Sequence, residues 1–222
     1  MRRVFGISGG GPVLAAALLL PCLHAQQKPL STAALAQKVD HHYNTLLSLK
    51  ADFVENYQGL GMSRTESGVL YLRKPGRMRW ANTQPAGKVF VLDGKFAWFY
   101  SQGDPQVQRI PAKELDDLRS PLRFLLGHTE LEKEMNHLTS APAANGEFTL
   151  SGQPKGQENR ILRLTLTVTA EGAITGIEMQ ETDGALTRFI FSDQQPNAAI
   201  AADVFRFTPP KGIPVVDAPP PV

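Results

Sequence analysis

The sequence predicts a mainly β fold of the α+β class, in which one amphipathic helix precedes a strongly curved or barrel-like antiparallel sheet. About ten short segments have the alternating or β-branched and aromatic pattern of strands. Gly, Pro and Asp-Gly turn signals separate these segments. Only one long segment, ahead of the strands, has the three- and four-residue apolar spacing of a helix.

The first 25 residues have the features of a secretory signal peptide. Arg2 and Arg3 precede an apolar run from Val13 to Leu20, and cleavage is expected after Ala25. The run is too short to span a bilayer, so we expect an exported, soluble product. Residues 26–217 are long enough for one domain with a sizeable core, and residues 218–222 form a Pro-rich tail.

The composition argues against several function classes. The chain has 23 Lys plus Arg against 21 Asp plus Glu, and loss of Arg2 and Arg3 with the signal peptide leaves these charges balanced. A neutral chain gives no reason to expect a nucleic-acid partner. Cys22, the one cysteine, leaves with the same segment. The exported chain therefore has no disulfide, thiol nucleophile or thiolate metal site.

Residues 31–50 predict the amphipathic helix, with Ser31 or Thr32 as its N-cap. An Asp-His-His run occupies residues 40–42 of this segment. Adjacent residues on a helix point apart, whereas metal pairs on a helix need three- or four-residue spacing. We therefore expect no metal site here.

Residues 68–100 contain the strongest strand signals, and neither face of their strands is polar. On the last strand Phe96, Trp98 and Tyr100 point to one side while Ala97 and Phe99 point to the other. Such a sheet is either packed on both sides or lines a ligand cavity on one of them. The expected strands are Val69–Arg73, Arg77–Trp80, Val89–Leu92 and Phe96–Tyr100.

A short apolar helix is expected at residues 120–127. Ser120 can cap it, Pro121 suits its first position, and Gly127 follows its end. At about two turns it cannot be stable alone, so it must lie against another apolar surface. It is either a movable cover over the two-sided sheet or a buried connector. Its apolar residues are Leu122, Phe124, Leu125 and Leu126.

Beyond this helix the sequence returns to strands. Residues 129–132 have a capping-box pattern that predicts one more short helical turn. A last short strand is expected at Val204–Thr208, before Pro209-Pro210. The strands expected between them are Glu147–Ser151, Ile161–Thr169, Ala173–Glu181 and Leu186–Ser192.

No motif for catalysis is present. The sequence contains no nucleophile elbow, phosphate-binding loop, zinc-protease motif or dinucleotide fingerprint. We therefore expect neither an enzyme nor a bound cofactor.

Eight segments resemble, in the same order, the family of periplasmic outer-membrane lipoprotein carriers (LolA). Each segment is a weak signal alone, but the ordered set spans nearly all of residues 26–217. The segments are Ala51-Asp52-Phe53, Gly68–Leu72, Lys74–Trp80, Asp93-Gly94-Lys95, Trp98–Tyr100, Ser120-Pro121-Leu122, Leu125-Leu126-Gly127 and Phe205–Gly212.

The resemblance implies an unclosed antiparallel β-barrel whose apolar inner face is covered by an N-terminal helix and short helices that form a lid. It also implies a monomeric periplasmic chaperone for outer-membrane lipoproteins. Such a chaperone receives its cargo from an inner-membrane ABC transporter and delivers it to an outer-membrane acceptor. The alternative is a periplasmic lipid-sensing or regulatory binding module of the same fold.

The resemblance and the strand pattern together give the expected site residues. Lys74 stands where the family has an Arg that is thought to bond to the lid, so it is expected to be a latch. It should be a weaker one, because Lys lacks the planar fork of Arg. Arg73 is expected to point to the opposite face. The expected lipid-binding residues are Met78, Trp80, Phe90, Leu92, Phe96, Trp98, Leu122, Phe124 and Leu125.

Overall fold

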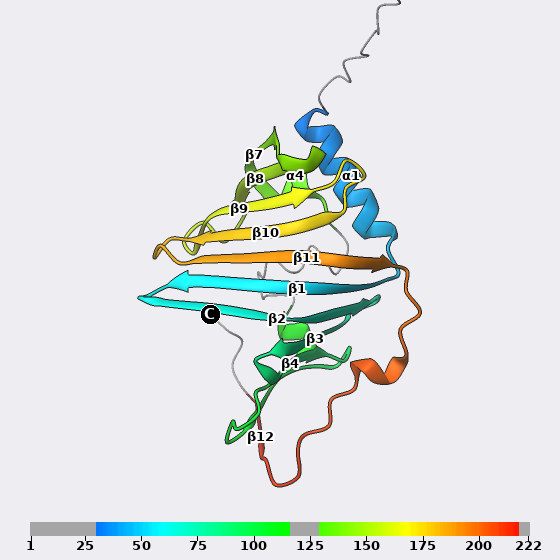
Figure 1. Ribbon diagram of the computed structural model, residues 1–222, viewed down its shortest axis with the longest axis vertical. Helices are drawn as coiled ribbons and strands as arrows, with labels where there is room; N and C mark the ends of the chain where they lie inside the picture. Colours follow the sequence, from blue (N-terminus) through cyan, green and yellow to red (C-terminus); the bar gives the residue numbers. More distant parts are fainter. Residues whose placement is uncertain (1–29, 116–128, 218–222) are drawn as a thin grey trace, which may run out of the picture.

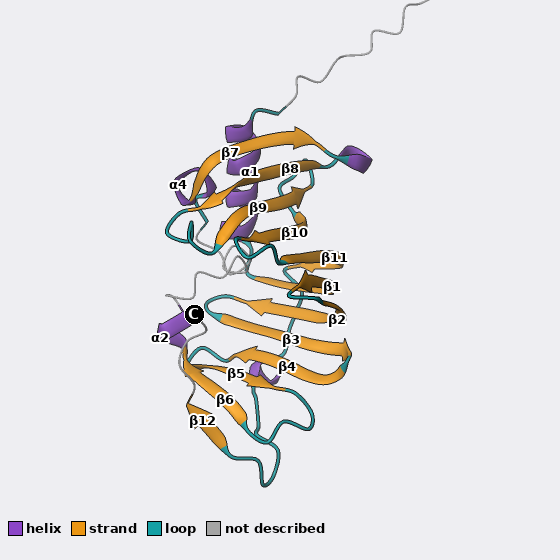
Figure 2. Ribbon diagram, turned by 90° about the vertical axis from the view of Figure 1, so that its left-hand side faces the viewer, coloured by secondary structure: helices purple, strands orange, loops and turns teal. Residues whose placement is uncertain are grey.

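The computed structural model describes residues 30–115 and 129–217, and these residues form one curved, twelve-stranded sheet. The strand order is β12-β6-β5-β4-β3-β2-β1-β11-β10-β9-β8-β7. Neighbouring strands are antiparallel except for β12, which runs parallel to β6. The sheet does not close, since β12 and β7 remain its two edges (Figure 1, Figure 2).

The bounds of the described elements are α1 (Thr32–Thr45), β1 (Ser48–Gly59), β2 (Met62–Arg73), β3 (Arg77–Gln84), β4 (Ala86–Leu92), β5 (Phe96–Tyr100), β6 (Val107–Pro111), α2 (Ala112–Leu115), α4 (Leu131–Glu134), β7 (Met135–Pro142), η1 (Ala144–Gly146), β8 (Phe148–Pro154), β9 (Ile161–Val168), β10 (Ile174–Glu181), β11 (Leu186–Pro196), η2 (Ala202–Phe205) and β12 (Val215–Asp217). None of the helices among them is long and apolar enough to cross a membrane.

The predicted fold class is confirmed, with differences in detail. The described residues contain twelve strands rather than about ten. Residues 204–208 are not a strand: η2 covers the first two, and the last strand is β12. The capping box expected at residues 129–132 does not form. Helix α4 begins at Leu131, and its N-cap residue Glu130 makes no side-chain cap hydrogen bond.

Helix α1 begins as predicted and ends early. The Ser31 side chain accepts a hydrogen bond from the Ala34 amide at 3.2 Å and so caps the helix. The helix stops at Thr45 rather than reaching residue 50, and β1 begins at Ser48. Leu49 fits the helical stripe, but it also fits the period of two in β1, where it is buried. Pairing of β1 with both β2 and β11 favours the strand.

Helix α1 packs on one face of the sheet through its buried stripe, and we call this the inner face. The hydroxyl of Tyr43 accepts a hydrogen bond from the Ile174 amide at 3.1 Å. Gly172 has a φ of +94° and lies so close to the backbone of Lys38 that a side chain would clash. The helix is therefore fixed against the start of β10. The stripe consists of Leu35, Ala36, Val39 and Tyr43.

The opposite, outer face of β2–β6 is covered by the chain that follows β11. Arg73 donates to the Ile200 carbonyl at 3.1 Å, and its guanidinium lies 5.2 Å from the Phe205 ring centre. The Phe207 ring lies 5.5 Å from the Trp98 ring. The sheet region with two apolar faces thus receives cover on its outer side from within the same chain. Arg73 points outward, as predicted.

Alkaline pH should weaken the fold through Tyr43. Burial raises the pKa of its hydroxyl to about 12, although the bond from Ile174 opposes part of that rise. Between pH 10 and 12 the unfolded chain therefore loses this proton while the folded chain keeps it. The free energy of unfolding should fall by up to about 1.4 kcal/mol per pH unit from this group.

Urea unfolding at pH 9 and pH 11 measures this loss. Tyr43→Phe should start less stable, because the Ile174 amide loses its partner, but should lose less stability between the two pH values than the wild type. Equal losses in both proteins would show that Tyr43 is not the group that titrates.

Candidate functional site

The inner face of β1–β6 is apolar near the β2–β3 turn and polar at the far ends of the strands. Residues two apart on a strand share a face, and the strand register aligns them into rows. The first row crosses the sheet as Leu49, Leu72, Met78, Leu92 and Ala97. The second row crosses it as Ala51, Leu70, Trp80, Phe90 and Phe99.

Four aromatic rings form a cluster at the centre of this face, which we call the aromatic cluster. Trp80 lies 4.7 Å from Phe53, 5.5 Å from Phe189 and 6.1 Å from Phe191, between ring centres. Their exposed fractions are only 2–7%. Phe53, Phe189 and Phe191 come from β1 and β11, so the cluster joins the two halves of the sheet.

The other predicted inner-face residues surround this cluster. The Trp80 indole N–H points to the Met78 sulfur at 2.9 Å. Phe90 lies 4.8 Å from Phe99, and both rings are half-buried. The structure thus brings Met78, Trp80, Phe90 and Leu92 together on one face, as expected. Met is unbranched and adapts its shape, which suits an irregular apolar surface.

Phe96 and Trp98 do not join them, because β5 turns these side chains to the outer face. Trp98 donates its indole N–H to the Asp93 carboxylate at 2.8 Å and contacts Phe207. The Arg109 guanidinium lies 4.5 Å from the Phe96 ring centre. Grouping Phe96 and Trp98 with Trp80 on one lining surface was therefore wrong. Phe99 holds the corresponding inner position in the register.

The remaining predicted lipid-binding residues lie outside the described part of the chain. These are Leu122, Phe124 and Leu125, in the segment expected to be a cover. The chain on either side of that segment is described. It enters through α2 and leaves through Thr129 and α4.

Lys74 bonds to helix α1. Its ammonium group donates to the carbonyl of Tyr43 in the last turn of the helix, and its amide donates to the Leu47 carbonyl at 2.9 Å. The carbonyls at a helix C-terminus lack intrahelical partners and carry partial negative charge, so a cation is favoured there. Burial lowers the pKa of Lys74. The contact ties the β2–β3 turn to a helix that packs on the other half of the sheet.

The chain that returns to the sheet at residue 129 is held by the same helix end. Asn44 and Thr129 exchange two hydrogen bonds, at 3.0 and 2.9 Å. The Asp40 carboxylate accepts from the Leu131 amide at 3.1 Å. Burial raises the pKa of Asp40, and the bonds to Thr129 and Leu131 limit that rise. The last turns of α1 therefore bond to both Lys74 and the start of α4.

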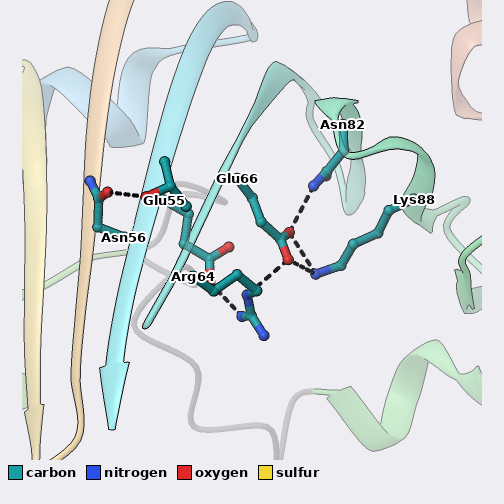
Figure 3. A network of polar contacts seen from close by, with 7 residues as sticks. Glu55, Asn56, Arg64, Glu66, Asn82 and Lys88 are labelled. Atoms are coloured by element: carbon teal, nitrogen blue, oxygen red, sulfur yellow. Dashed lines mark hydrogen bonds and ion pairs between the residues drawn. The ribbon is translucent and has the colours of Figure 1, made fainter. Parts of the chain in front are cut away.

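A polar network occupies the inner face beyond the aromatic cluster, and we call it the Glu66 network (Figure 3). Glu66 is 4% exposed and lies between partners from three strands. Lys88 reaches its two carboxylate oxygens at 2.8 and 2.6 Å, Arg64 bonds at 2.8 Å and Asn82 at 2.7 Å. Arg64 also pairs with Glu55 at 3.2 Å.

The partners of Glu66 decide its ionisation. Burial by itself raises the pKa of this carboxyl, but the hydrogen bonds from Lys88 and Asn82, together with the nearby charges, outweigh that effect and lower it. Glu66 is thus held as a carboxylate with its acceptor sites used. The network gives the apolar part of the inner face a fixed polar border.

A hollow of about 500 Å³ lies on the outer side, between η2 and the turns that flank β3 and β5. Arg77, Lys95 and Arg206 contribute charged groups to its lining. Asp93 faces it too. Burial raises the pKa of that carboxyl, but bonds from Phe96, Trp98 and Lys95 outweigh burial and lower it. A lining of this kind is unsuited to hydrocarbon.

Nothing in the described ranges indicates metal chemistry. Within residues 30–115 and 129–217 no group of three or more His, Cys, Asp or Glu side chains is placed to hold an ion. The Asp-His-His run at residues 40–42 lies on α1, where Asp40 bonds to Leu131 and His42 contacts the Tyr43 ring.

Several inner-face residues were missed from the sequence. Phe189 and Phe191 lie 136 and 138 residues after Phe53, so only the pairing of β1 with β11 brings them together. Phe99 could have been found, because its alternation with Phe96 and Trp98 was visible. Glu66 carried no signal, since a single Glu in a strand is typical of a solvated face.

The Glu66 network should contribute more stability than an exposed ion pair. Lys88→Met removes one partner and leaves a buried carboxylate, which should lower the free energy of unfolding by roughly 1–3 kcal/mol. Glu178→Gln, which removes the exposed pair with Arg188, should cost less than about 1 kcal/mol. Urea unfolding at pH 7 compares the two variants.

The pH dependence gives a second test of the same network. Glu66 has a lowered pKa, so its contribution is present above the ordinary glutamate pKa near 4.5 and is lost as the pH falls through the lowered value. The deficit of Lys88→Met should therefore shrink in acid. A deficit that is constant with pH, or equal to that of Glu178→Gln, would contradict the assignment.

Lys74 should control local opening of the last turn of α1. Lys74→Met removes the donor to Tyr43 and should speed hydrogen exchange at the Leu46 amide about fivefold or more, whereas Lys74→Arg should keep a donor there. Arg73→Met, on the outer face, serves as the matched control. Unchanged exchange in Lys74→Met would show that α1 is held without this contact.

Comparison with known proteins gives a consistent assignment. A family model described as "Outer membrane lipoprotein carrier protein LolA" matches residues 44–208. An outer-membrane lipoprotein carrier protein of Chromobacterium violaceum is 33% identical over 207 residues, which cover 92% of this chain and 96% of the relative. A protein of the same name from Pectobacterium carotovorum subsp. carotovorum is 29% identical over 204 residues, covering 90% and 97%.

Solved structures share the fold at low identity. An uncharacterized conserved protein from Thermus thermophilus has a TM-score of 0.53 at 13% identity, covering 83% of this chain and 97% of that one. The Mycobacterium tuberculosis lipoprotein LppX has a TM-score of 0.51 at 13% identity, covering 78% and 98%. At such identities the likeness concerns the fold alone.

Proposed function

The chain belongs to the LolA family of outer-membrane lipoprotein carrier proteins, and on that premise we propose that it shields the acyl chains of lipoproteins on the inner face of its sheet. It is a periplasmic lipoprotein chaperone, and a carrier of this kind makes and breaks no covalent bond. Residues 1–25 act as its signal peptide. The donor is an inner-membrane ABC transporter, the acceptor is an outer-membrane protein, and the carrier works as a monomer.

The need for a carrier follows from the hydrophobic effect. At about 0.8 kcal/mol per methylene, exposing a sixteen-carbon acyl chain to water costs on the order of 12 kcal/mol. A lipoprotein with three such chains would cost roughly three times as much. An apolar surface that replaces water around these chains removes most of that cost. The cargo can then cross an aqueous compartment.

The observation that carries the proposal is the apolar inner face with its polar border. The rows that contain Met78, Leu92, Trp80 and Phe90 supply aliphatic and aromatic surface. The Glu66 network follows on the same face, with its charges paired. Hydrocarbon is favoured on the first part and disfavoured on the second. The acyl chains therefore lie on the side of the β2–β3 turn.

Handover requires a carrier whose hold on its cargo can change. The Lys74 contact with the last turn of α1 supports a role as a latch, because it joins the β2–β3 turn to the helix end that also bonds Thr129. Breaking this contact separates the β2–β3 turn from the end of α1, while α1 stays packed through its buried stripe and stays bonded to Thr129 and Leu131. Transfer then needs only a donor and an acceptor with different affinities for the cargo.

Two phenylalanines on β5 test which face holds the lipid. Phe99→Ser should lower the amount of lipoprotein that copurifies with the exported carrier about fivefold or more, because it removes apolar surface from the inner face. Phe96→Ser, three residues away on the outer face and also half-buried, should leave that amount unchanged. Quantitative immunoblotting of a coexpressed lipoprotein measures both.

Thermal unfolding of the two variants serves as the control for folding. Equal loss of lipoprotein from both variants, or no loss from Phe99→Ser, would contradict the assignment of the inner face. A wild-type protein that binds lipid but never passes a lipoprotein to outer-membrane vesicles would instead favour the regulatory module.

A further inference from the structure

The tip of the β1–β2 hairpin exposes two large apolar side chains. Leu60 is 77% exposed and Met62 is 62% exposed. They lie at the end of the hairpin, where Gly59 pairs with Met62 across the two-residue turn of Leu60 and Gly61. In Figure 1 this tip reaches the left-hand limit of the sheet, beside the connection between β10 and β11.

The backbone of this turn is unfavourable for leucine. Leu60 has a φ of +51° and Gly61 a φ of +75°, and two positive φ values in a two-residue hairpin turn favour Asn-Gly. Leucine rarely adopts this conformation, because its Cβ crowds the backbone. The chain thus holds an apolar side chain at a position where a polar residue would be more stable. Such strain often marks a functional position.

Going from the tip of the hairpin back along β1 and β2, the side chains become progressively more polar. Tyr57 and Arg64 pair across the strands, and the guanidinium lies 5.3 Å from the ring centre. Arg64 in turn bonds to Glu55 and Glu66, so the base of the tip carries balanced charge. An apolar apex followed by an aromatic ring and an arginine is the order of groups found at membrane interfaces.

We propose that the Leu60–Met62 tip inserts shallowly into the interface of a lipid bilayer. A protein partner would need a surface of about 1,000 Å² or more, which two projecting side chains do not supply, whereas interfacial binding scales with the apolar area buried and can be weak and reversible. Because the charges behind the apex are paired, the binding depends on apolar insertion and not on anionic lipid. The proposal that the tip inserts into a bilayer is argued from the tip residues alone. The further idea that insertion brings the carrier to a membrane rests on the proposed function.

The test compares variants of the exported protein in flotation with vesicles of phosphatidylcholine and phosphatidylethanolamine. Leu60→Asn should lower the partition into vesicles about tenfold, and Met62→Thr should lower it severalfold. Leu60→Asn also creates the preferred Asn-Gly turn, so its Tm should rise by roughly 2–4 °C. Loss of binding in a more stable protein cannot be attributed to misfolding.

Leu47 provides the matched control at the opposite end of β1. It is the same residue type with a similar exposed fraction, 69%, so Leu47→Asn should leave vesicle binding unchanged. Wild-type protein that does not float with vesicles, Leu60→Asn that floats as well as wild type, or Leu47→Asn that loses as much binding would each overturn the proposal. The proposal would also be overturned if Leu60→Asn kept its vesicle binding but lost lipoprotein delivery, because the tip would then contact a protein partner and not a bilayer.

The amount of copurifying lipoprotein separates this proposal from the proposed function. Leu60→Asn should keep its bound lipoprotein, because the tip lies beyond the Glu66 network and away from the apolar rows. If the wild-type protein binds vesicles through the tip but never holds lipoprotein, membrane insertion of the tip is supported and the carrier function is refuted.

Discussion

The structure depends on one constraint: strands β2–β6 carry apolar side chains on both faces, so both faces must be covered from water. The chain covers the outer face with its own C-terminal segment. Arg73 and Arg79 from β2 and β3 donate to the carbonyls of Ile200, Val204 and Arg206, and Phe205 and Phe207 fill the space beneath. Because this cover comes from the same chain, the two faces have different roles. The inner face carries α1 on one half and the two apolar rows of β1–β5 on the other.

Two sets of contacts bound the inner face at opposite ends of the strands. At one end Lys74 bonds to the last turn of α1, and that turn also holds Thr129. At the other end the Glu66 network keeps a buried carboxylate charged with donors from three strands. At the first end a single side-chain hydrogen bond, from the Lys74 ammonium to the Tyr43 carbonyl, joins the turn to the helix and can open. The second end is held by a saturated network that should remain fixed while cargo enters and leaves.

Local signals predicted much of this arrangement. The Asp93-Gly94 turn, the Ser31 cap and the alternation along β5 depend on neighbouring residues, and each appears in the structure. Alternation showed that Phe96 and Phe99 point apart, but one strand cannot tell which side is inner. That choice depends on the register from Trp80 through Phe90 to Phe99.

Long-range pairing accounts for most of what the sequence did not predict. Phe53 meets Phe191 only because β1 pairs with β11, across more than half of the chain. The alternation of Phe205 and Phe207 looked like a strand, yet these residues lie on the outer face without strand pairing. Glu66 became visible as a network only when β2, β3 and β4 were aligned.

The central claim is that lipid lies on the inner face, and photo-crosslinking from a lipoprotein with a diazirine in its acyl chains tests it most directly. Crosslinks mapped by mass spectrometry should fall on the row that contains Trp80, Phe90 and Phe99. Crosslinks to Trp98 and Phe207 on the outer face, with none on that row, would contradict the account.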